Sequence, residues 1–364
     1  MISHFDTYES LIEYIHKLDP VEYGKTRNFT NGAVTYLSPF ISRGIISTKI
    51  VYEIMKKRGF ELNQIESFVK ELCWRDYFQR IWQERNLDIE IKQAQTKHTF
   101  QDLPSAIQEK TLSIPFFNEQ IEQLEATGYL HNHVRMYLAS LICNIGQYHW
   151  KMPAQWMYYH LLDGDWASNA CSWQWVCGAN SQKMYMMNEE NVSFFTKAAI
   201  SNSYLNRFHQ NPFDTWIPDE WNDSKTFLLK TNLPKVADLK LDNSLPTCIY
   251  NYYNIDPQWK KELKANRVLL LEPAIFERFP VSDLCIQFLL NYAQWIDGIQ
   301  IFVGSFEELK EKHLSKASIY FKEHPLNKHY KGNKEQRDWI LDSVTGYFPS
   351  FFAYWKKCTP LLNA

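Results

Sequence analysis

Apolar residues recur three and four positions apart along most of the first two hundred residues, which is the spacing of one face of an α-helix. Ser, Asn or Pro stands near the start of several of these stretches, as is typical of helix N-termini. The pattern predicts helices at 8–18, 38–57, 65–85, 132–147 and 152–162. We therefore expect the first half of the chain to be all-α.

The pattern changes in the second half of the chain. Residues 209–225 are rich in Pro, Asp and Asn without periodicity, which is typical of a connector. Short β-branched or aromatic runs then alternate with helix-like stretches, as they do in βαβ units with a parallel sheet. The expected strands lie within 247–253, 267–273, 299–305 and 318–324, and the expected helices within 282–296 and 306–314.

Together these patterns predict a mainly α protein, in which a helical domain is followed by a smaller α/β segment with a parallel sheet. We expect the helical domain at 1–205, a connector at 206–245 and the α/β domain at 246–364. The amphipathic and aromatic tail at 331–358 is interpreted as a packing helix. No apolar stretch reaches eighteen residues, so no membrane span is predicted, and we expect a monomer.

Composition and charge narrow the functional classes. The seven cysteines form no CxxC pair and no metal-type Cys/His spacing, which is typical of the reducing cytoplasm and predicts no metal site. The first eighteen residues carry acidic residues early and no long apolar run, so we expect no signal or transit peptide. The net charge of −2 gives no overall basic field, so any binding to nucleic acid must be local. Aromatic residues make up 16% of the chain, an excess that suggests stacking surfaces.

The most unusual stretch is LLDGDWASNACSWQWVCG at 161–178. Asp163 and Asp165 follow a predicted helix, and two carboxylates in such apolar surroundings each need a partner. Arg135 is a candidate, because it lies three positions after Asn132 and both residues then share one helical face. We infer that this region holds a ligand and is not simple core.

Four motifs occur in an order that resembles the FAD-binding helical domain of the DNA photolyase and cryptochrome family. They are TYLSPFISRGIIS, FVKELCWRDYF, TGYLHNHVRM and LLDGDWASNACSWQW, and the resemblance covers roughly residues 1 to 200. It implies an FAD cofactor held within a helical bundle. It also implies a light-driven reaction on UV-damaged DNA.

The resemblance implies a set of cofactor contacts. Arg135 and Asp163 resemble the ion pair beside the flavin ring, Asp165 an acceptor for the ring's polar edge, and Asn169 the residue that faces flavin N5. An uncharged amide at that last position adds no second negative charge to a reduced flavin, which favours a repair enzyme over a plant-type light sensor. Ser38 alone could be only a helix cap, but in company with the other motifs we assign it to the phosphates. The full expected set is Tyr23, Thr35, Leu37, Ser38, Phe68, Glu71, Arg75, Asn132, Arg135, Asp163, Asp165 and Asn169.

The resemblance also implies lesion contacts. Glu71, Trp74 and Arg75 share one helical stripe by spacing, and on their own they could be an ordinary ion pair beside a core indole. Within the family pattern, Glu71 is a buried carboxyl that contacts lesion and flavin, and Trp74 and Trp175 clamp a flipped dinucleotide.

Asn132 and Met136 stand where members that repair cyclobutane dimers carry Asn and Met, whereas His131 and His133 fall beside the positions used for six-four photoproducts. Lys183 is the expected phosphate contact after Arg75. Lys25 and Arg27 are weaker candidates.

Two departures from the family pattern matter. Trp173 and Trp150 match the inner members of the electron relay to the flavin, but the outer position falls near Lys97, which leaves Trp82, Tyr148 or Trp156 as substitutes. The α/β domain at 246–364 resembles part of the family's antenna domain, displaced to a place after the helical domain. It lacks the family's opening signature, so the sequence gives little support for an antenna pigment. We expect a cyclobutane pyrimidine dimer photolyase. The alternatives are a cryptochrome-like photoreceptor and a flavoprotein that binds damaged DNA without repairing it.

Overall fold

The computed structural model describes residues 4–95, 97–181, 183–314 and 318–363. The chain divides into two compact units, and each unit combines segments that are far apart in the sequence. Unit 1 consists of 21–34 and 85–229, and unit 2 of the described residues within 2–20, 35–84 and 230–364. This division differs from the domain boundaries at 205 and 245 expected from the sequence, which stay a prediction.

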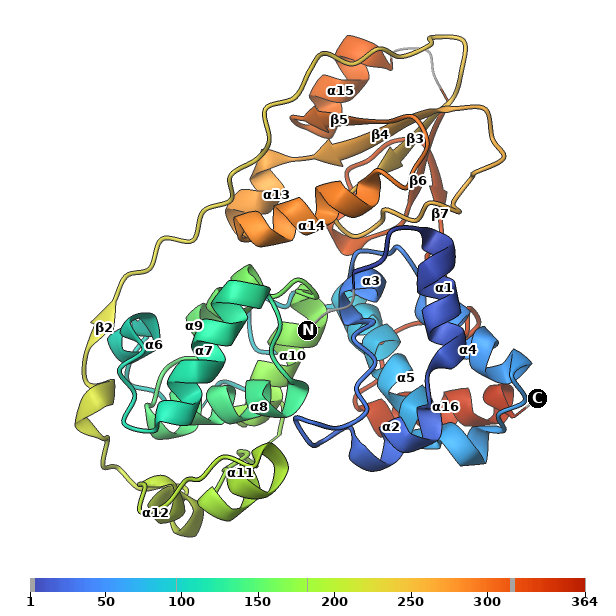
Figure 1. The fold of residues 1–364 in the computed structure, drawn as a ribbon. Helices are drawn as coiled ribbons and strands as arrows, with labels where there is room; N and C mark the ends of the chain where they lie inside the picture. The colour runs from blue at the N-terminus through green and yellow to red at the C-terminus, as the bar shows by residue number, and fades with distance from the viewer. Residues whose placement is uncertain (1–3, 96, 182, 315–317, 364) are drawn as a thin grey trace. The chain divides into compact units, whose positions relative to one another are not determined.

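The described residues of unit 1 are mainly helical and include a two-residue strand pair, β1 (Leu103–Pro104) with β2 (Ser224–Lys225). Near its centre, α10 (Trp166–Val176) contacts both α8 (Asn132–Ser140) and α9 (Lys151–His160) (Figure 1). A short π-helix continues α8 directly. The helices are α2 (Pro20–Thr26), which starts at the unit boundary, α6 (Ser105–Glu109), α7 (Pro115–Thr127), α8 (Asn132–Ser140), the π-helix Leu141–Ile145, α9 (Lys151–His160), α10 (Trp166–Val176), α11 (Glu189–Thr196), α12 (Leu205–Gln210) and the 3-10 turn Asp219–Trp221.

Unit 2 combines N-terminal helices with a five-stranded sheet. All strand pairs in this sheet are parallel, in the order β5-β4-β3-β6-β7. The strands are β3 (Thr247–Tyr250), β4 (Asn266–Leu271), β5 (Ile299–Val303), β6 (Ile319–Lys322) and β7 (Asn333–Glu335). The helices are α1 (Tyr8–Lys17), α3 (Ser38–Ser42), α4 (Thr48–Lys57), α5 (Leu62–Glu84), α13 (Pro273–Arg278), α14 (Asp283–Ala293), α15 (Phe306–His313), the 3-10 turn Pro325–Asn327 and α16 (Phe351–Leu362).

Helices cover both faces of the sheet, as expected for βαβ units. On one face Phe306 and Leu309 of α15 pack against Val268 and Leu270 of β4, and α13 and α14 lie on the other face (Figure 1). The predicted fold class, a helical part with a parallel α/β segment, is confirmed.

Two details of the predicted elements were wrong. The stretch 38–57 forms two helices, because Gly44 adopts a left-handed φ of +64° and a Cβ there would lie 2.5 Å from the carbonyl oxygen of Tyr253. The tail expected to be a packing helix contains the edge strand β7 and irregular chain, and its helix α16 starts only at Phe351.

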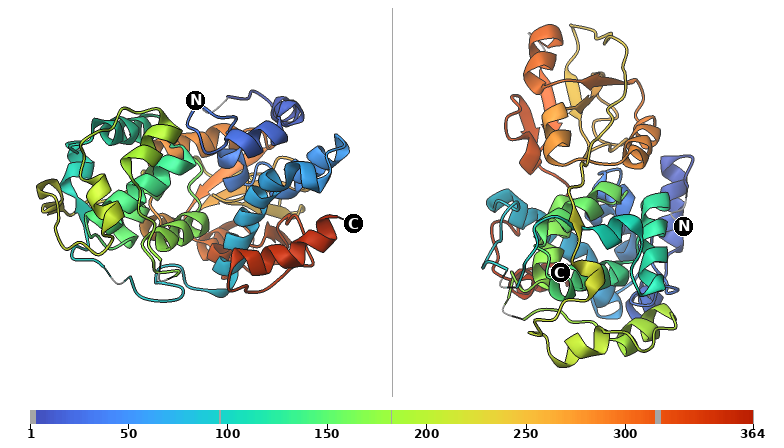
Figure 2. Two further views of the ribbon diagram at one scale, coloured as in Figure 1. Left: turned by 90° about the horizontal axis from the view of Figure 1, so that it is seen from below. Right: turned by 90° about the vertical axis from the view of Figure 1, so that its left-hand side faces the viewer.

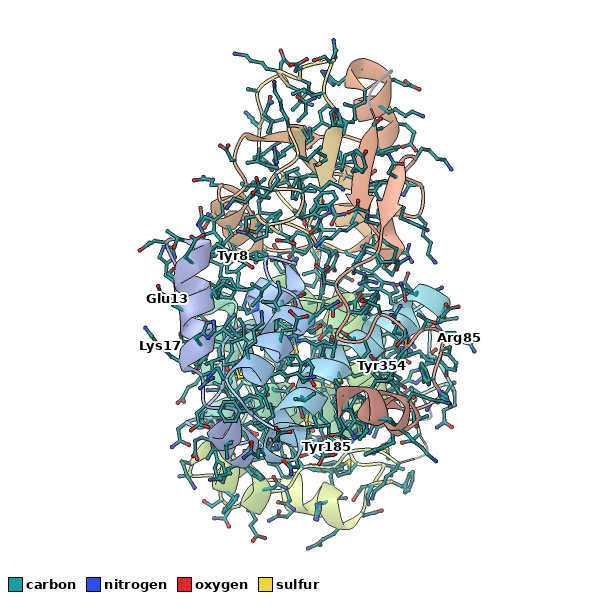
Figure 3. The ribbon with its side chains drawn as sticks, turned by 90° about the vertical axis from the view of Figure 1, so that its right-hand side faces the viewer. Tyr8, Glu13, Lys17, Arg85, Tyr185 and Tyr354 are labelled. Carbon is teal, nitrogen blue, oxygen red and sulfur yellow. The ribbon has the colours of Figure 1, made fainter. Side chains whose placement is uncertain are left out.

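Helix α16 packs on α5, which carries the ELCWRD motif, and Figure 2 shows the two side by side in unit 2. Tyr354 lies on the side of α16 that faces α5 (Figure 3), with its ring centroid 5.7 Å from that of Tyr77. Among the described residues, no helix is long and apolar enough to cross a membrane.

Candidate functional site

The predicted ion pair between Arg135 and Asp163 is present in unit 1. Nη1 and Nη2 of Arg135 donate to Oδ2 and Oδ1 of Asp163 at 3.1 and 3.0 Å, and Nε donates to the carbonyl oxygen of Leu130 at 2.8 Å. The Asp163 side chain is only 4% exposed and that of Arg135 is 21% exposed. A bidentate, largely desolvated pair of this kind holds both side chains in one orientation.

The turn between α9 and α10 fixes the position of Asp163. A Cβ at Gly164 would lie 2.9 Å from the carbonyl oxygens of both Leu161 and Tyr158, so this close approach requires glycine. Asp165 then caps α10, with Oδ1 accepting from the backbone N–H of Ala167 at 3.0 Å and Oδ2 from the hydroxyl of Ser168 at 2.7 Å. The two aspartates thus have different local roles, and the predicted contact of Asp165 with a flavin edge stays a prediction.

Asn169 lies one turn into α10 and is half-buried. Its side-chain amide donates to the carbonyl oxygen of Ala154 in α9 at 2.7 Å, which fixes the orientation of the amide.

The two predicted inner relay residues, Trp150 and Trp173, are both buried in unit 1. Nε1 of Trp150 donates to Glu90 at 3.0 Å. Burial acts to raise the pKa of Glu90, but hydrogen bonds from Trp150 and His149 bring it below its ordinary value. Trp166, an aromatic that the sequence analysis did not assign to the relay, stacks on Trp150 with centroids 6.2 Å and planes 29° apart. Trp166 could have been found from the sequence, because it directly follows Asp165 within the motif.

The outer relay position is not aromatic in this chain. Lys97 uses its ammonium group to hold loops together, donating to the carbonyl oxygens of Asn144, Pro212 and Asp214. The three substitutes considered from the sequence are all buried, and none of them provides a surface end for a relay: Trp82, Tyr148 and Trp156.

The start of α8 presents a polar edge. Asn132 is exposed and Met136 is half-buried one turn further along. His131 caps the helix, with Nδ1 accepting from the backbone of His133 at 3.2 Å, and burial lowers the pKa of His131 to about 4. His133 stacks on Phe195 at 4.5 Å. Both histidines therefore have local structural contacts.

The remaining predicted residues of unit 1 are more exposed. The Trp175 side chain is 44% exposed and stacks on Tyr185 with centroids 5.6 Å apart. Lys183 is exposed, and Tyr23 is half-buried in α2. Lys25 is exposed, 4.0 Å from Glu22, and Arg27 donates to Asn28 at 2.8 Å.

The other predicted residues belong to unit 2. Helix α3 begins at Ser38 followed by Pro39, as the sequence suggested, with Leu37 at the cap position. Oγ1 of Thr35 accepts from the backbone N–H of Leu37 at 3.3 Å. Phe68 is buried in α5.

Glu71, Trp74 and Arg75 follow on α5, and all three side chains are half-buried, so Glu71 is less buried than the sequence suggested. Nη1 of Arg75 donates to the hydroxyl of Ser42 at 2.9 Å. The indole of Trp74 stacks face to face on Phe351, with centroids 3.8 Å apart and planes 10° apart. The predicted site residues are thus divided between the two units.

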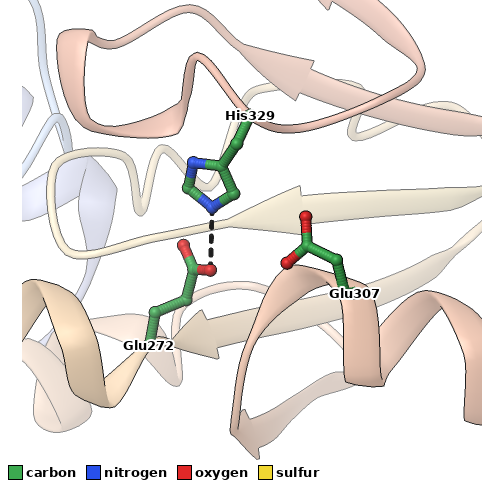
Figure 4. A group of neighbouring side chains, drawn as sticks. All are labelled: Glu272, Glu307 and His329. Atoms are coloured by element: carbon green, nitrogen blue, oxygen red, sulfur yellow. Dashed lines mark hydrogen bonds and ion pairs between the residues drawn. The ribbon is translucent and has the colours of Figure 1, made fainter.

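A second polar cluster lies at the carboxyl end of β4 (Figure 4). The ligand atoms of Glu272, Glu307 and His329 lie within 4.8 Å of one another. Oε1 of the buried Glu272 accepts from the backbone N–H of Phe306 at 3.0 Å and lies 2.9 Å from Nε2 of His329, and Oε2 accepts from Tyr330 at 2.9 Å. These contacts join β4 to the start of α15 and to the loop after β6, so we interpret the cluster as structural.

Comparisons with known proteins show what the middle of the chain is similar to. Residues 68–235 match the family described as the FAD binding domain of DNA photolyase. This match confirms, over that region, the resemblance to the DNA photolyase and cryptochrome family.

Individual relatives carry both family names. A cryptochrome DASH of Danio rerio is 31% identical over 166 residues, which is 43% of this chain and 32% of that protein. A deoxyribodipyrimidine photo-lyase of Alkalihalophilus pseudofirmus is 23% identical over 215 residues, 56% of this chain and 44% of that protein. The matched regions thus span less than half the length of these relatives. A solved class III photolyase from Agrobacterium tumefaciens is similar with 24% identity and a TM-score of 0.44, covering 56% of this chain and 44% of that one.

Proposed function

We propose that this protein binds FAD and uses light to split cyclobutane pyrimidine dimers in UV-damaged DNA. The observation that carries the proposal is the bidentate Arg135–Asp163 pair, held by α8 and by the turn before α10 within the region that matches the FAD binding domain. Bound FAD would supply light-driven one-electron transfer. This chain's residues would bind the cofactor, exclude water and hold the lesion.

The donor set in unit 1 fits a flavin. Arg135 offers a guanidinium whose position is fixed by three hydrogen bonds, and it remains 21% exposed. Asn169 offers an amide whose orientation is fixed by Ala154. An uncharged amide and a paired guanidinium can contact the polar edge of a flavin without adding net negative charge.

The lesion side of the proposal rests on Glu71, Trp74 and Arg75. These half-buried side chains lie on one helix and combine a carboxyl, an indole and a guanidinium. The indole would stack on a flipped base, and Glu71, when its carboxyl is neutral, would donate a hydrogen bond to a pyrimidine carbonyl that has gained an electron.

A cryptochrome-like photoreceptor is the second candidate. Two observations favour it: cryptochrome DASH relatives of Danio rerio and Xenopus laevis are 31% and 30% identical, and Lys97 stands where an outer relay aromatic is expected. A photoreceptor would bind FAD and respond to light without repairing DNA.

One experiment separates these functions. Purified protein is mixed with dithionite and a dimer-containing oligothymidylate, in light and in darkness, and thymine absorbance is followed. We expect recovery in light only. Flavin photochemistry without recovery would favour the photoreceptor, light-independent binding without repair would favour a damage-binding protein, and a preparation that cannot be reconstituted with FAD would contradict all three.

A further inference from the structure

The stacking partner of Trp74 is a residue from the far end of the chain. Phe351, the first residue of α16, lies 3.8 Å from the Trp74 ring centroid at an interplanar angle of 10°. Parallel aromatic rings usually stack with an offset, and a centroid separation this short means that the two ring faces overlap closely. One face of the indole is therefore covered by a flat ring.

Phe351 is firmly held. It is only 2% exposed, and it packs parallel to Trp355 at 6.2 Å and edge-on to Tyr77 at 5.9 Å. Ser350 caps α16 by accepting from the backbone N–H of Ala353 at 3.2 Å, which fixes Phe351, the residue after the cap, as the start of the helix.

Both ends of the C-terminal segment are also tied down. The hydroxyl of Tyr77 donates to the carbonyl oxygen of Phe348 at 3.3 Å, and that of Tyr52 donates to the carbonyl oxygen of Leu362 at 3.0 Å. A ligand could displace Phe351 only by breaking this packing. The Phe351 ring therefore stays against one face of the Trp74 indole. Any stacking ligand must use the rest of the half-buried indole surface.

We propose that Phe351 is a positioning residue, which fixes the plane of the Trp74 indole for stacking on a nucleobase. The nature of the ligand rests on the proposed function. An indole held in one orientation binds a nucleobase more tightly than a mobile indole does, because less side-chain freedom is lost on binding. A leucine at 351 would keep apolar volume but would present no flat face, so the indole could tilt.

The chain offers a matched control next to the test position. Phe352 is 72% exposed and meets Phe351 edge-on at 6.0 Å, so Phe352→Leu changes the same residue type on the same helix while keeping the Phe351 ring that stacks on Trp74. The test compares Phe351→Leu, Phe352→Leu, Trp74→Ala and the Trp74→Ala/Phe351→Leu double variant. The measurements are dark dissociation constants for dimer-containing oligothymidylate, quantum yields at saturation and thermal midpoints.

We expect Phe351→Leu to weaken lesion affinity about three- to tenfold, as the loss of an aromatic pair would, with little change in quantum yield. Phe352→Leu should behave as the parent. The double variant should bind no more weakly than Trp74→Ala, because Phe351 acts through the indole. A folded Phe351→Leu variant with parental affinity, or a loss of affinity that adds fully to that of Trp74→Ala, would overturn the proposal.

A second measurement keeps this inference separate from the proposed function. If the parent binds no lesion, the function fails, but the position of the indole can still be read by fluorine NMR of protein labelled with 5-fluorotryptophan. The Trp74 signal is assigned by its absence in Trp74→Phe. Phe351→Leu should shift and broaden it, and Phe352→Leu should not. An unchanged signal in Phe351→Leu would show that Phe351 does not position Trp74.

Discussion

Arg135 and Asp163 are joined by two nearly equal hydrogen bonds of 3.1 and 3.0 Å, although they stand on different elements, α8 and the turn after α9. Removing either partner leaves the other as a desolvated charge. The pair therefore couples the geometry of the helix start to that of the DGD turn.

Replacing Arg135 or Asp163 with Ala should reduce FAD retention at least tenfold while leaving far-UV circular dichroism near that of the parent. The reason is that the unpaired partner loses its fixed orientation beside the proposed flavin. Flavin released on denaturation gives the measurement. Lys110→Ala is the control, since it breaks the Lys110–Glu125 ion pair elsewhere in unit 1. Full retention in both test variants would mean that the pair does not contact the cofactor.

Trp173→Phe should slow photoreduction of the flavin by about tenfold or more, whereas repair by chemically reduced protein should stay close to the parental rate. Phe keeps most of the buried volume but is much harder to oxidise than an indole. Transient absorption and a steady-state repair assay measure the two effects. Trp166→Phe tests whether the neighbour of Trp150 takes part in the same relay. Unchanged photoreduction in Trp173→Phe would show that electrons enter by another route.

Trp74→Ala should mainly weaken lesion binding, whereas Glu71→Ala should mainly lower the repair yield. Loss of a stacking wall should cost about 1–3 kcal/mol of dark lesion affinity, with a smaller change in yield at saturation. Loss of Glu71 should lower the yield more than the affinity, because its hydrogen bond strengthens only when the lesion carries the extra electron. Dark dissociation constants and quantum yields distinguish the two. Parental values for both variants would make this helix purely structural and would favour the photoreceptor.

Asp76, the residue after Arg75, should make stability depend on pH. It accepts from Thr48 at 2.7 Å and from the backbone of Ile340 at 2.9 Å, and burial raises its pKa from 3.8 to about 6. Between these values the folded state holds more protons than the unfolded state, so stability should fall as pH rises from about 4 to about 6.

Asp76→Asn should remove this dependence, which amounts to at most about 3 kcal/mol for a shift of this size. Urea unfolding at several pH values measures the effect. Asp342→Asn, at an exposed ion pair with Lys49, is the control. If the free energy of unfolding depended on pH in the same way in the parent and in Asp76→Asn, the raised pKa assigned to Asp76 would be contradicted.

Local patterns were sufficient to predict most helices and the four apolar strands. The need of the carboxylates in the DGD turn for a partner correctly predicted the contact of Asp163 with Arg135. Features set by distant segments could not be predicted. The break at Gly44 depends on Tyr253, and β7 is a polar edge strand whose sequence carries no apolar signal. Trp166 was visible in the motif, but its alignment with Trp150 depends on how α9 and α10 pack.

The way unit 2 is assembled from both halves of the chain has a consequence for biosynthesis. Asp76 accepts from the backbone of Ile340, 264 positions away, and Tyr77 donates to Phe348, 271 positions away. While the ribosome is still making the α/β segment, α5 has none of these partners, whereas unit 1 needs nothing beyond residue 229. Nascent chains should therefore acquire protease resistance in unit 1 first, and ELCWRD should stay accessible to chaperones until the segment that carries Ile340 and Phe348 has been made.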